Sequence, residues 1–364
     1  ILTERAPRRH KTPAPAQISN QHHTDKMTRL GTRLGKSLAR TTAATLITCA
    51  AALATSCGSV FDDLPPCRSG VELRFIFDHN MEEANSFHKQ VDCLTLYLYG
   101  SDGRLIATYG EDSGALASED YRMDIDLDPG HYRAVAYGGM RCADASFEPV
   151  PEPAAGSQYT QLAVALKPGH VGKRLHNHYH GALEFEVPPP SPDGLVKQTI
   201  NFKRTTNHFR VTLQHADGSP IDGTIFDYSI TDDNALLDHE NNPVATGVPT
   251  TYPHWTKGTI TASKADGDGI IAYGELSTSR VISGTSPKLR VGNIQTGETV
   301  LEIPLIRYLA ASQSDATDYA EQDYLDRCGQ WNLIFFLNGN NKWADTDVII
   351  NDWVVRFNDI ELNP

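Results

Sequence analysis

The stretch YRMDIDLDPGHYRAVAY, residues 121–137, decides the fold class. Apolar residues at positions 121, 123, 125 and 127 alternate with charged ones, which is typical of a strand that buries one face. The Asp-Pro-Gly sequence at 128–130 then predicts a turn, and residues 131–137 return as a second strand. This pattern predicts antiparallel β-structure.

Alternation of this kind recurs along the chain between turn residues. Short helices are expected at 304–309, with proline in the first turn, and at 318–327. The further strand-like segments are 71–77, 94–98, 209–213, 331–337 and 348–362. The chain is therefore predicted to be mainly all-β, built as antiparallel β-sandwiches with short helical insertions.

A proline-rich run divides the chain. The sequence PPPSPDG occupies residues 188–194, and consecutive prolines do not fit a central strand but favour a stiff, extended connector. We therefore expect an N-terminal domain at 57–187, a linker at 188–195 and a C-terminal domain at 196–364.

Residues 27–56 have the features of a bacterial lipoprotein signal peptide. A basic segment follows Met27, and the apolar run at 41–55 is too short to span a bilayer as a helix. Small residues then precede Cys57, which is the predicted lipidation site. The alternative is an ordinary secretory signal followed by a chance cysteine. Residues 1–26 form an upstream extension that we expect not to belong to the native product.

The charge balance restricts the partners of the chain. The whole sequence carries −13, and residues 1–56 hold nine Lys/Arg and two Asp/Glu, so the remainder carries −20. Such a surface repels nucleic acid, and no nucleic-acid partner is expected. After residue 57 no apolar run reaches transmembrane length, so a lipid would be the membrane attachment.

The disulfide candidates are Cys67, Cys93 and Cys142, which fall in the first half of the chain. An exported protein meets an oxidising compartment, so one pair among them is expected, although the spacing does not decide which. No C-x-x-C spacing supports a metal site instead.

Two clusters resemble metal sites. His176, His178 and His180 would share one face of a strand and could converge on zinc, but no carboxylate or cysteine completes the group locally. Aspartates at 124, 126 and 128 alternate with apolar residues, which favours a solvated strand face over a calcium site. We predict no metal and no cofactor.

Because the sequence lacks the common catalytic motifs, we also predict that the protein is not an enzyme.

Nine short segments carry a family pattern along the chain. They are Leu64–Cys67, Val71–Phe75, Ala84–Asp92, Leu94–Tyr97, Glu119–Met123, Ala136–Met140, Leu175–Gly181, Gln322–Arg327 and Ile350–Trp353. Their order, together with the lipoprotein signal, resembles the FimB-type fimbrial anchor subunits of type V pili. His178 and His180 depart from the usual residues of that family, which weakens the metal interpretation further.

The resemblance implies two tandem transthyretin-like β-sandwich domains on a lipid anchor in the outer membrane, exposed at the cell surface as part of a fimbrium. It also implies a fimbrial stalk subunit and accessory pilus subunits as partners. Family members hold a fimbrium to the cell and limit its length. Pilus subunits of this type join when a strand of one enters a groove of the next. We expect the C-terminal segment 348–362, or the groove beside it, to make this contact.

A surface glycan-binding lipoprotein or a tip adhesin is the alternative function. It would need an exposed aromatic platform, for which the candidates are Trp255, Trp331, Trp343 and Trp353. Trp331 opens a strand and Trp353 alternates with core-like residues, which leaves Trp255 and Trp343. Trp343 adjoins a polar loop and is expected to be exposed. Both tryptophans on one open face would favour glycan binding, and a deep cleft with close acidic pairs would favour a hydrolase.

Overall fold

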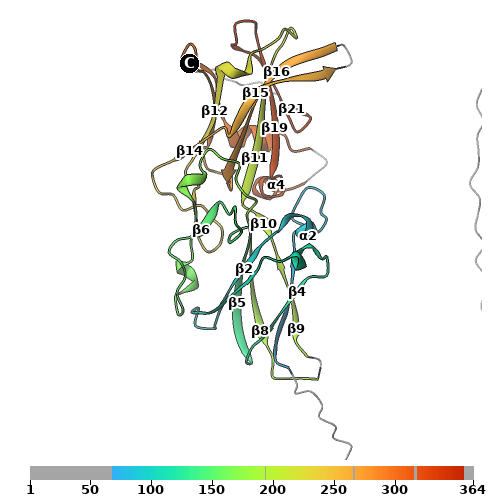
Figure 1. Ribbon diagram of the computed structural model, residues 1–364, viewed down its shortest axis with the longest axis vertical. Coiled ribbons are helices and arrows are strands. Elements are labelled where there is room, and N and C mark those ends of the chain that lie inside the picture. The colour runs from blue at the N-terminus through green and yellow to red at the C-terminus, as the bar shows by residue number, and fades with distance from the viewer. Residues whose placement is uncertain (1–67, 193, 265–266, 315–317, 356–364) are drawn as a thin grey trace, which may run out of the picture. The chain divides into compact units, whose positions relative to one another are not determined.

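The computed structural model describes residues 68–192, 194–264, 267–314 and 318–355 (Figure 1). We call residues 68–205 the N-terminal lobe and residues 206–355 the C-terminal lobe. Both lobes belong to one compact unit, Pro66–Pro364. Within the described residues, no helix is long and apolar enough to cross a bilayer.

The N-terminal lobe consists of two facing sheets. One has the strand order β4-β1-β9, and the other has the order β10-β8-β5-β2-β3. The strands are β1 (Gly70–Ile76), β2 (Leu94–Tyr99), β3 (Leu105–Glu111), β4 (Arg122–Asp126), β5 (Gly130–Gly138), β8 (Tyr179–Val187), β9 (Val196–Asn201) and β10 (Lys203–Arg204). Leu96 and Leu98 of β2 pack between the sheets with Val71 and Leu73 of β1, and all four side chains are fully buried.

The two strands of residues 121–137 form as predicted, but they do not pair with each other. β4 pairs with β1, whereas β5 pairs with β2 and β8 in the other sheet. The turn at 128–130 is therefore a corner between two sheets rather than the tip of a hairpin. Burial explains this, because Ile125 faces the core from one sheet and Ala134 and Ala136 face it from the other.

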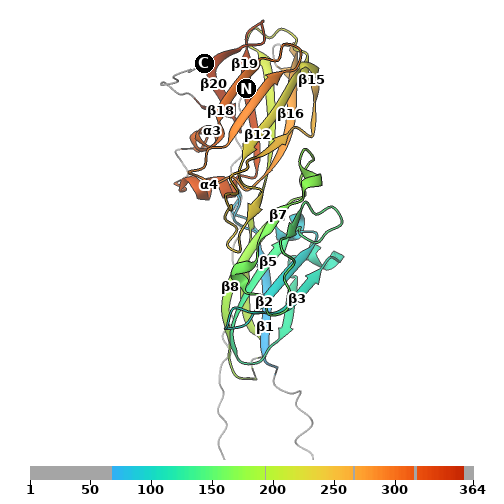
Figure 2. The ribbon, with the colours of Figure 1, turned by 90° about the vertical axis from the view of Figure 1, so that its left-hand side faces the viewer.

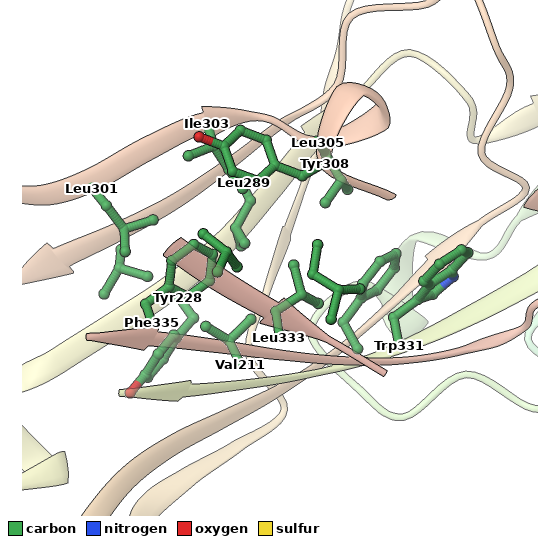
Figure 3. Packing of buried hydrophobic residues seen from close by; sticks show 14 of the residues in the cluster. Val211, Tyr228, Leu289, Leu301, Ile303, Leu305, Tyr308, Trp331, Leu333 and Phe335 are labelled. Carbon is green, nitrogen blue, oxygen red and sulfur yellow. The ribbon is translucent and has the colours of Figure 1, made fainter. Parts of the chain in front are cut away.

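The C-terminal lobe is a second sandwich, shown with the first in Figure 2. Its sheets have the orders β15-β16-β11-β19-β20-β21 and β14-β12-β17-β18. The strands are β11 (Thr206–His215), β12 (Phe226–Asp232), β14 (Thr250–Pro253), β15 (Thr256–Lys264), β16 (Gly267–Ser279), β17 (Lys288–Asn293), β18 (Thr299–Pro304), β19 (Gln330–Leu337), β20 (Trp343–Ile350) and β21 (Trp353–Val355). Trp331, Leu333 and Phe335 of β19 pack toward Tyr228 and Leu289 of the opposite sheet (Figure 3).

The all-β prediction is confirmed, with one addition. Most strand pairs are antiparallel, but β1 pairs parallel with β9 and β11 pairs parallel with β19. Short helices connect the strands, and two of them lie where the sequence predicted them, at α3 and α4. The helices are α2 (Phe87–Gln90), α3 (Leu305–Ala311), α4 (Glu321–Arg327) and the 3-10 turns η1 (Gly114–Ala117), η2 (Tyr159–Gln161), η3 (Pro168–His170) and η4 (Gly223–Ile225).

A small third sheet joins the two lobes. β6 (Phe147–Pro149) and β7 (Val164–Leu166) come from the N-terminal lobe, and β13 (Leu236–Leu237) of the C-terminal lobe pairs with β7. Beneath this sheet lies a third hydrophobic cluster, in which Tyr97 and Tyr137 pack with Tyr252 of the C-terminal lobe. The five-stranded sheet is therefore buried on both faces where the lobes meet.

The predicted linker does not separate the lobes. Residues 188–195 connect β8 to β9, and both strands belong to sheets of the N-terminal lobe. β9 is retained there because it hydrogen-bonds to β1 over six residue pairs, from Val71 opposite Val196 to Ile76 opposite Asn201. The chain passes into the C-terminal sheets after β10, at Thr205, about ten residues after the end of the predicted linker.

Candidate functional site

The C-terminal hairpin places an exposed strand at the edge of the six-stranded sheet. β20 and β21 pair antiparallel, with Ile350 opposite Trp353. The intervening residues 351 and 352 both have positive φ, 47° and 71°, the geometry of a tight two-residue hairpin turn. One side of β21 is paired with β20, and it has no strand partner on its other side among the described residues.

The side chains of β21 divide between solvent and core. Trp353 is 53% exposed and Val354 is 54% exposed, whereas Val355 is 3% exposed and belongs to the hydrophobic core. Of the predicted contact segment 348–362, Val348 and its neighbours lie inside the sheet in β20. Residues 356–362 lie outside the described residues. Among the described residues of segment 348–362, β21 is therefore the strand that lies at the open edge of the sheet.

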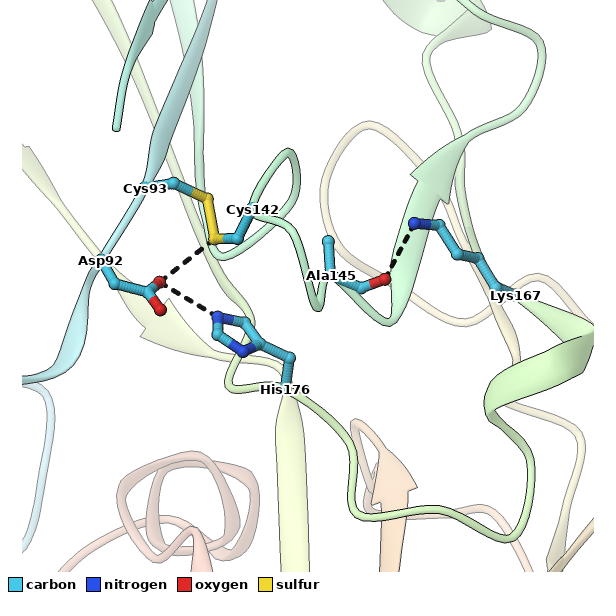
Figure 4. The surroundings of a disulfide bond; sticks show 6 residues. All are labelled: Asp92, Cys93, Cys142, Ala145, Lys167 and His176. Carbon is cyan, nitrogen blue, oxygen red and sulfur yellow. Dashed lines mark hydrogen bonds and ion pairs between the residues drawn. A yellow bond between two sulfur atoms is a disulfide. The ribbon is translucent and has the colours of Figure 1, made fainter. Parts of the chain in front are cut away.

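Cys93 and Cys142 form a disulfide that ties the start of β2 to the loop after β5 (Figure 4). Both were disulfide candidates. Cys67, the third candidate, and Cys57, the predicted lipidation site, lie outside the described residues. The disulfide joins two residues that are 49 positions apart in the sequence, so it reduces the entropy of the unfolded chain.

Asp92 lies beside this disulfide and pairs with His176, with Nε2 3.0 Å from Oδ1 (Figure 4). The same carboxylate oxygen is 3.1 Å from Cys142 Sγ, so three atoms of metal-ligand type come together. The Cys142 sulfur is already bonded to Cys93 and cannot supply a thiolate. The group is explained by the ion pair between His176 and Asp92.

The other two histidines of the predicted cluster are packed as aromatic rings. His178 stacks against Phe147 and Tyr137, with ring centroids 4.6 and 5.5 Å apart, and is completely buried. His180 lies against the same Tyr137 ring, and its Nε2 contacts the main-chain oxygen of His239 in the C-terminal lobe. Burial lowers the pKa of His178 to about 3 and that of His180 to about 4. Both are therefore neutral near pH 7.

The aspartates of β4 form a solvated strand face, as the alternation indicated. Asp124 and Asp126 are exposed and both accept hydrogen bonds from Arg68, at 3.2 and 3.0 Å. Asp128 lies beyond the strand, in the corner before β5. The three carboxylates do not surround a common point.

Trp343, which was expected to be exposed, is partly buried, and it does not share an open face with Trp255. Trp343 is partly buried against the core of the C-terminal lobe, edge-on to Phe335 at 5.9 Å. Trp255 precedes β15 and lines a hollow near Asn332, at the beginning of β19, whereas Trp343 lies opposite Leu337, at its end. The two indoles do not form one platform, because they lie near opposite ends of β19.

A buried ion pair at the lobe junction was not anticipated from the sequence. Arg280 and Asp326 form two hydrogen bonds, and their side chains are 10% and 1% exposed. Lys203 of the N-terminal lobe lies 3.6 Å from the same carboxylate. Segment 322–327 contributed to the family resemblance, but no local pattern links it to Arg280, 46 residues earlier.

Nearby, α4, the residues just before it and the loop after β1 supply further contacts between the lobes. The Tyr319 hydroxyl donates to Glu83 at 2.8 Å, and Arg327 lies 3.6 Å from the same carboxylate. His79 is 3.3 Å from Asp323. Together with the β7–β13 pairing, these contacts show that polar and apolar groups join the two lobes, in addition to the chain that connects them.

Comparison with known proteins gives matches over most of the chain. The family model described as fimbrillin-A associated anchor proteins Mfa1 and Mfa2 matches residues 64–359. Among solved structures, a candidate adhesin from Bacteroides thetaiotaomicron VPI-5482 is 40% identical, with a TM-score of 0.76 over 81% of this chain and 100% of that one. Candidate polysaccharide-binding proteins from the same organism are 28% identical, with a TM-score of 0.68 over 80% of this chain and 98% of theirs.

The fimbrial anchor protein Mfa2 from Porphyromonas gingivalis shares the fold. It is 16% identical, with a TM-score of 0.60 over 80% of this chain and 99% of that one. No curated protein sequence matches the chain. The resemblance to a fimbrial anchor family is confirmed. Because the family model covers residues 64–359, the chain belongs to the family of fimbrillin-A associated anchor proteins Mfa1 and Mfa2.

Proposed function

We propose that this protein is a lipid-anchored fimbrial subunit that attaches a type V pilus to the outer membrane and limits its length. The observation that carries the proposal is the match of the anchor family model to residues 64–359. Acylation at Cys57 supplies the membrane attachment, because the preceding residues form a lipoprotein signal. More than one acyl chain is required, since a single chain holds a protein only marginally.

An acylated N-terminus explains how one subunit stops a polymer. Fimbrial subunits join by strand complementation, in which main-chain hydrogen bonds supply the affinity. A subunit whose N-terminal end is held in the membrane cannot pass that end to a neighbour. It therefore occupies the base of the pilus, where it binds the stalk subunit and accessory subunits through another surface.

β21 is the proposed contact for strand complementation. In a two-residue hairpin the residues that flank the turn, here Ile350 and Trp353, form a hydrogen-bonded pair. The next residue, Val354, is opposite Ile349 in a pair without mutual hydrogen bonds, so its N–H and C=O point away from β20. Those two groups are available to an incoming strand.

The contact is tested with Val354→Pro in the full-length protein. Proline removes the outward N–H and leaves the hydrogen bonds between Ile350 and Trp353 in place. Since Val354 is 54% exposed, the sandwich should remain folded. We expect fimbriae to be released from the cell or to become overlong, measured by electron microscopy of cells and by the amount of stalk subunit shed into the medium.

Val354→Thr is the matched control, because threonine keeps the N–H and suits a strand. Circular dichroism and thermal unfolding of the purified variants show whether each folds. A folded, lipidated Val354→Pro protein that retains fimbriae of normal length would exclude β21 as the contact. Glycan binding as the main function has less support, because Trp255 and Trp343 do not share a face.

A further inference from the structure

A polar hollow of about 410 Å³ lies on the outer face of the six-stranded sheet, where the N-terminal lobe meets it. Its volume falls in the range of roughly 300–1,000 Å³ that is typical of small-molecule sites. The sheet register aligns three of its side chains in one row, because Arg210 of β11 is opposite both Glu275 of β16 and Asn332 of β19. Neighbouring strands thus present a guanidinium, a carboxylate and an amide side by side.

The first arginine of the hollow is held in place by its neighbours. The Arg210 guanidinium lies over the Tyr273 ring, 5.1 Å from its centroid, and its Nε is 3.8 Å from Glu275 Oε1. A stacked and paired guanidinium loses little freedom when a ligand binds. Arg210 and Glu275 therefore form a pre-arranged donor and acceptor pair.

The second arginine, Arg174, comes from the N-terminal lobe and is exposed. It has no hydrogen bond or ion pair with any described residue. Three residues later, the Asn177 side-chain oxygen is 2.9 Å from Nε2 of His208 in the C-terminal lobe. The Asn177 carbonyl also lies so close to Gly139 that a Cβ there would be 1.9 Å from its oxygen. Arg174 is thus an exposed cation without a hydrogen bond or ion pair to the described residues, close to a segment that both lobes contact.

The remaining groups of the hollow suit hydroxyl groups and an apolar ring face. The side-chain amides of Gln330 and Asn332 are exposed and make no hydrogen bond with a described residue. Trp255 lines the same hollow with a side chain that is only partly buried. His208, at its inner wall, has its pKa lowered to about 4 by burial and by Arg174 and Arg204, so it is neutral near pH 7.

A peptide strand is a poor fit for this place. The hollow lies on the face of the sheet, and the main-chain groups of β11, β16 and β19 around it are already paired in the ladders. Recognition must therefore use side chains alone. Guanidiniums bind a carboxylate, amides and Glu275 bind hydroxyls, and an indole packs on the C–H face of a sugar ring.

We propose that this hollow binds an acidic sugar residue of a glycan, with Arg174 and Arg210 on its carboxylate and Trp255 against its ring. The site is distinct from β21 and does not depend on the lipid anchor. It would let a protein at the base of a fimbrium also hold an acidic polysaccharide.

The experiment titrates the full-length protein with D-glucuronic acid and, as the uncharged match, D-glucose, and follows binding by NMR and calorimetry. We expect D-glucuronic acid to bind more tightly than D-glucose. Arg174→Ala should weaken D-glucuronic acid about tenfold, because a charge-assisted hydrogen bond is lost, and should leave D-glucose unchanged. Lys173→Ala, one residue earlier, exposed and outside the hollow, is the matched control and should bind as the unaltered protein does.

Asn332→Asp places a carboxylate on an exposed side chain of the hollow and should repel D-glucuronic acid without affecting the fold. Trp255→Ala should weaken both sugars, and Trp255→Phe should restore part of the affinity. Equal binding of the two sugars, absence of binding, or full affinity in Arg174→Ala and Asn332→Asp would overturn the proposal. Loss of stalk-subunit binding in these variants with D-glucuronic acid binding unchanged would overturn it too, and would identify a protein contact.

Discussion

The guanidinium of Arg280 binds the carboxylate of Asp326 through two hydrogen bonds, from Nε to Oδ1 at 2.8 Å and from Nη2 to Oδ2 at 2.7 Å. Arg280 also donates from Nη1 to the main-chain oxygen of Asn241, in the loop after β13. The pair therefore links α4 to the loop after β13, and β13 is the strand of the C-terminal lobe that pairs with β7 of the N-terminal lobe. Lys203 of the N-terminal lobe adds a second positive charge at 3.6 Å.

Removing one partner of this pair should strongly destabilise the protein. Asp326→Ala leaves the Arg280 charge buried without its carboxylate, which costs about 3–5 kcal/mol of unfolding free energy. Lys203→Ala removes a charge that is 48% exposed and should cost less than about 1 kcal/mol. Urea unfolding of the two variants measures both values. If Asp326→Ala were as stable as Lys203→Ala, the pair would not contribute to the junction.

The sequence predicted many strands of the N-terminal lobe but few of the contacts between the two lobes. Alternation identified segment 94–98 as a strand, and the structure buries its Leu94, Leu96 and Leu98 in the core. It did not reveal that Tyr97 and Tyr99 on the opposite face are also buried, because the segments that cover them are distant in sequence. A strand without charged positions, such as LTLYLY, is itself the sign of burial on both faces.

Strand partners were the second feature that local patterns could not supply. Nothing in the sequence at 196–201 shows that β9 pairs parallel with β1, since such pairing depends on the crossover between them. The proline run was therefore assigned to a boundary between domains, although it only connects two sheets of one lobe. Trp343 was misjudged for a similar reason, because its burial comes from packing against Phe335.

Domain boundaries can be tested with two truncations. We propose residues 68–205 and 206–364 as the two domains, and we expect the fragment 68–205 to unfold cooperatively. The fragment 67–190 should not do so, because it lacks β9 and the fully buried Ile200 and Phe202. Circular dichroism and urea unfolding of the two fragments give the comparison. Equal stability of both would mean that β9 and β10 are dispensable and that the linker is the boundary after all.

We expect Asp232 to make the free energy of unfolding depend on pH. Burial raises its pKa from 3.8 to about 6, and its Oδ2 is buried without a hydrogen-bond partner among the described residues. The folded protein therefore binds this proton more tightly than the unfolded chain does, and the contribution of Asp232 to stability increases as the pH falls from about 6 to 4. We expect a gain of about 2 kcal/mol over this range, because each unit of pKa difference is worth roughly 1.4 kcal/mol.

Asp232→Asn removes the titration and should be more stable than the unaltered protein at pH 7, with a flatter profile between pH 4 and 6. Urea unfolding at several pH values measures this. Asp120→Asn, at an exposed position, is the control and should leave the profile unchanged. A profile in which Asp232→Asn and the unaltered protein remain parallel would show that Asp232 has an ordinary pKa.

Lipid attachment is tested at the cysteine itself. Cys57→Ala removes the thiol that an acyl chain would modify, so the protein should leave the outer-membrane fraction and fimbriae should be shed with it. Mass spectrometry of the mature N-terminus and labelling with a palmitate analogue measure the modification directly. Cys49→Ala, in the apolar part of the same signal, is the matched control, because it removes a thiol and leaves Cys57 and the residues before it intact.

The two cysteine variants distinguish the anchor from an ordinary secretory signal. A lipoprotein signal predicts that Cys49→Ala is acylated and retained while Cys57→Ala is neither. An ordinary signal predicts that both variants are exported, unacylated and recovered in the same fraction as the unaltered protein. The second result would remove the membrane attachment on which the base position depends, and it would leave the contact at β21 as a separate question, since Val354 and its open edge do not involve the N-terminus.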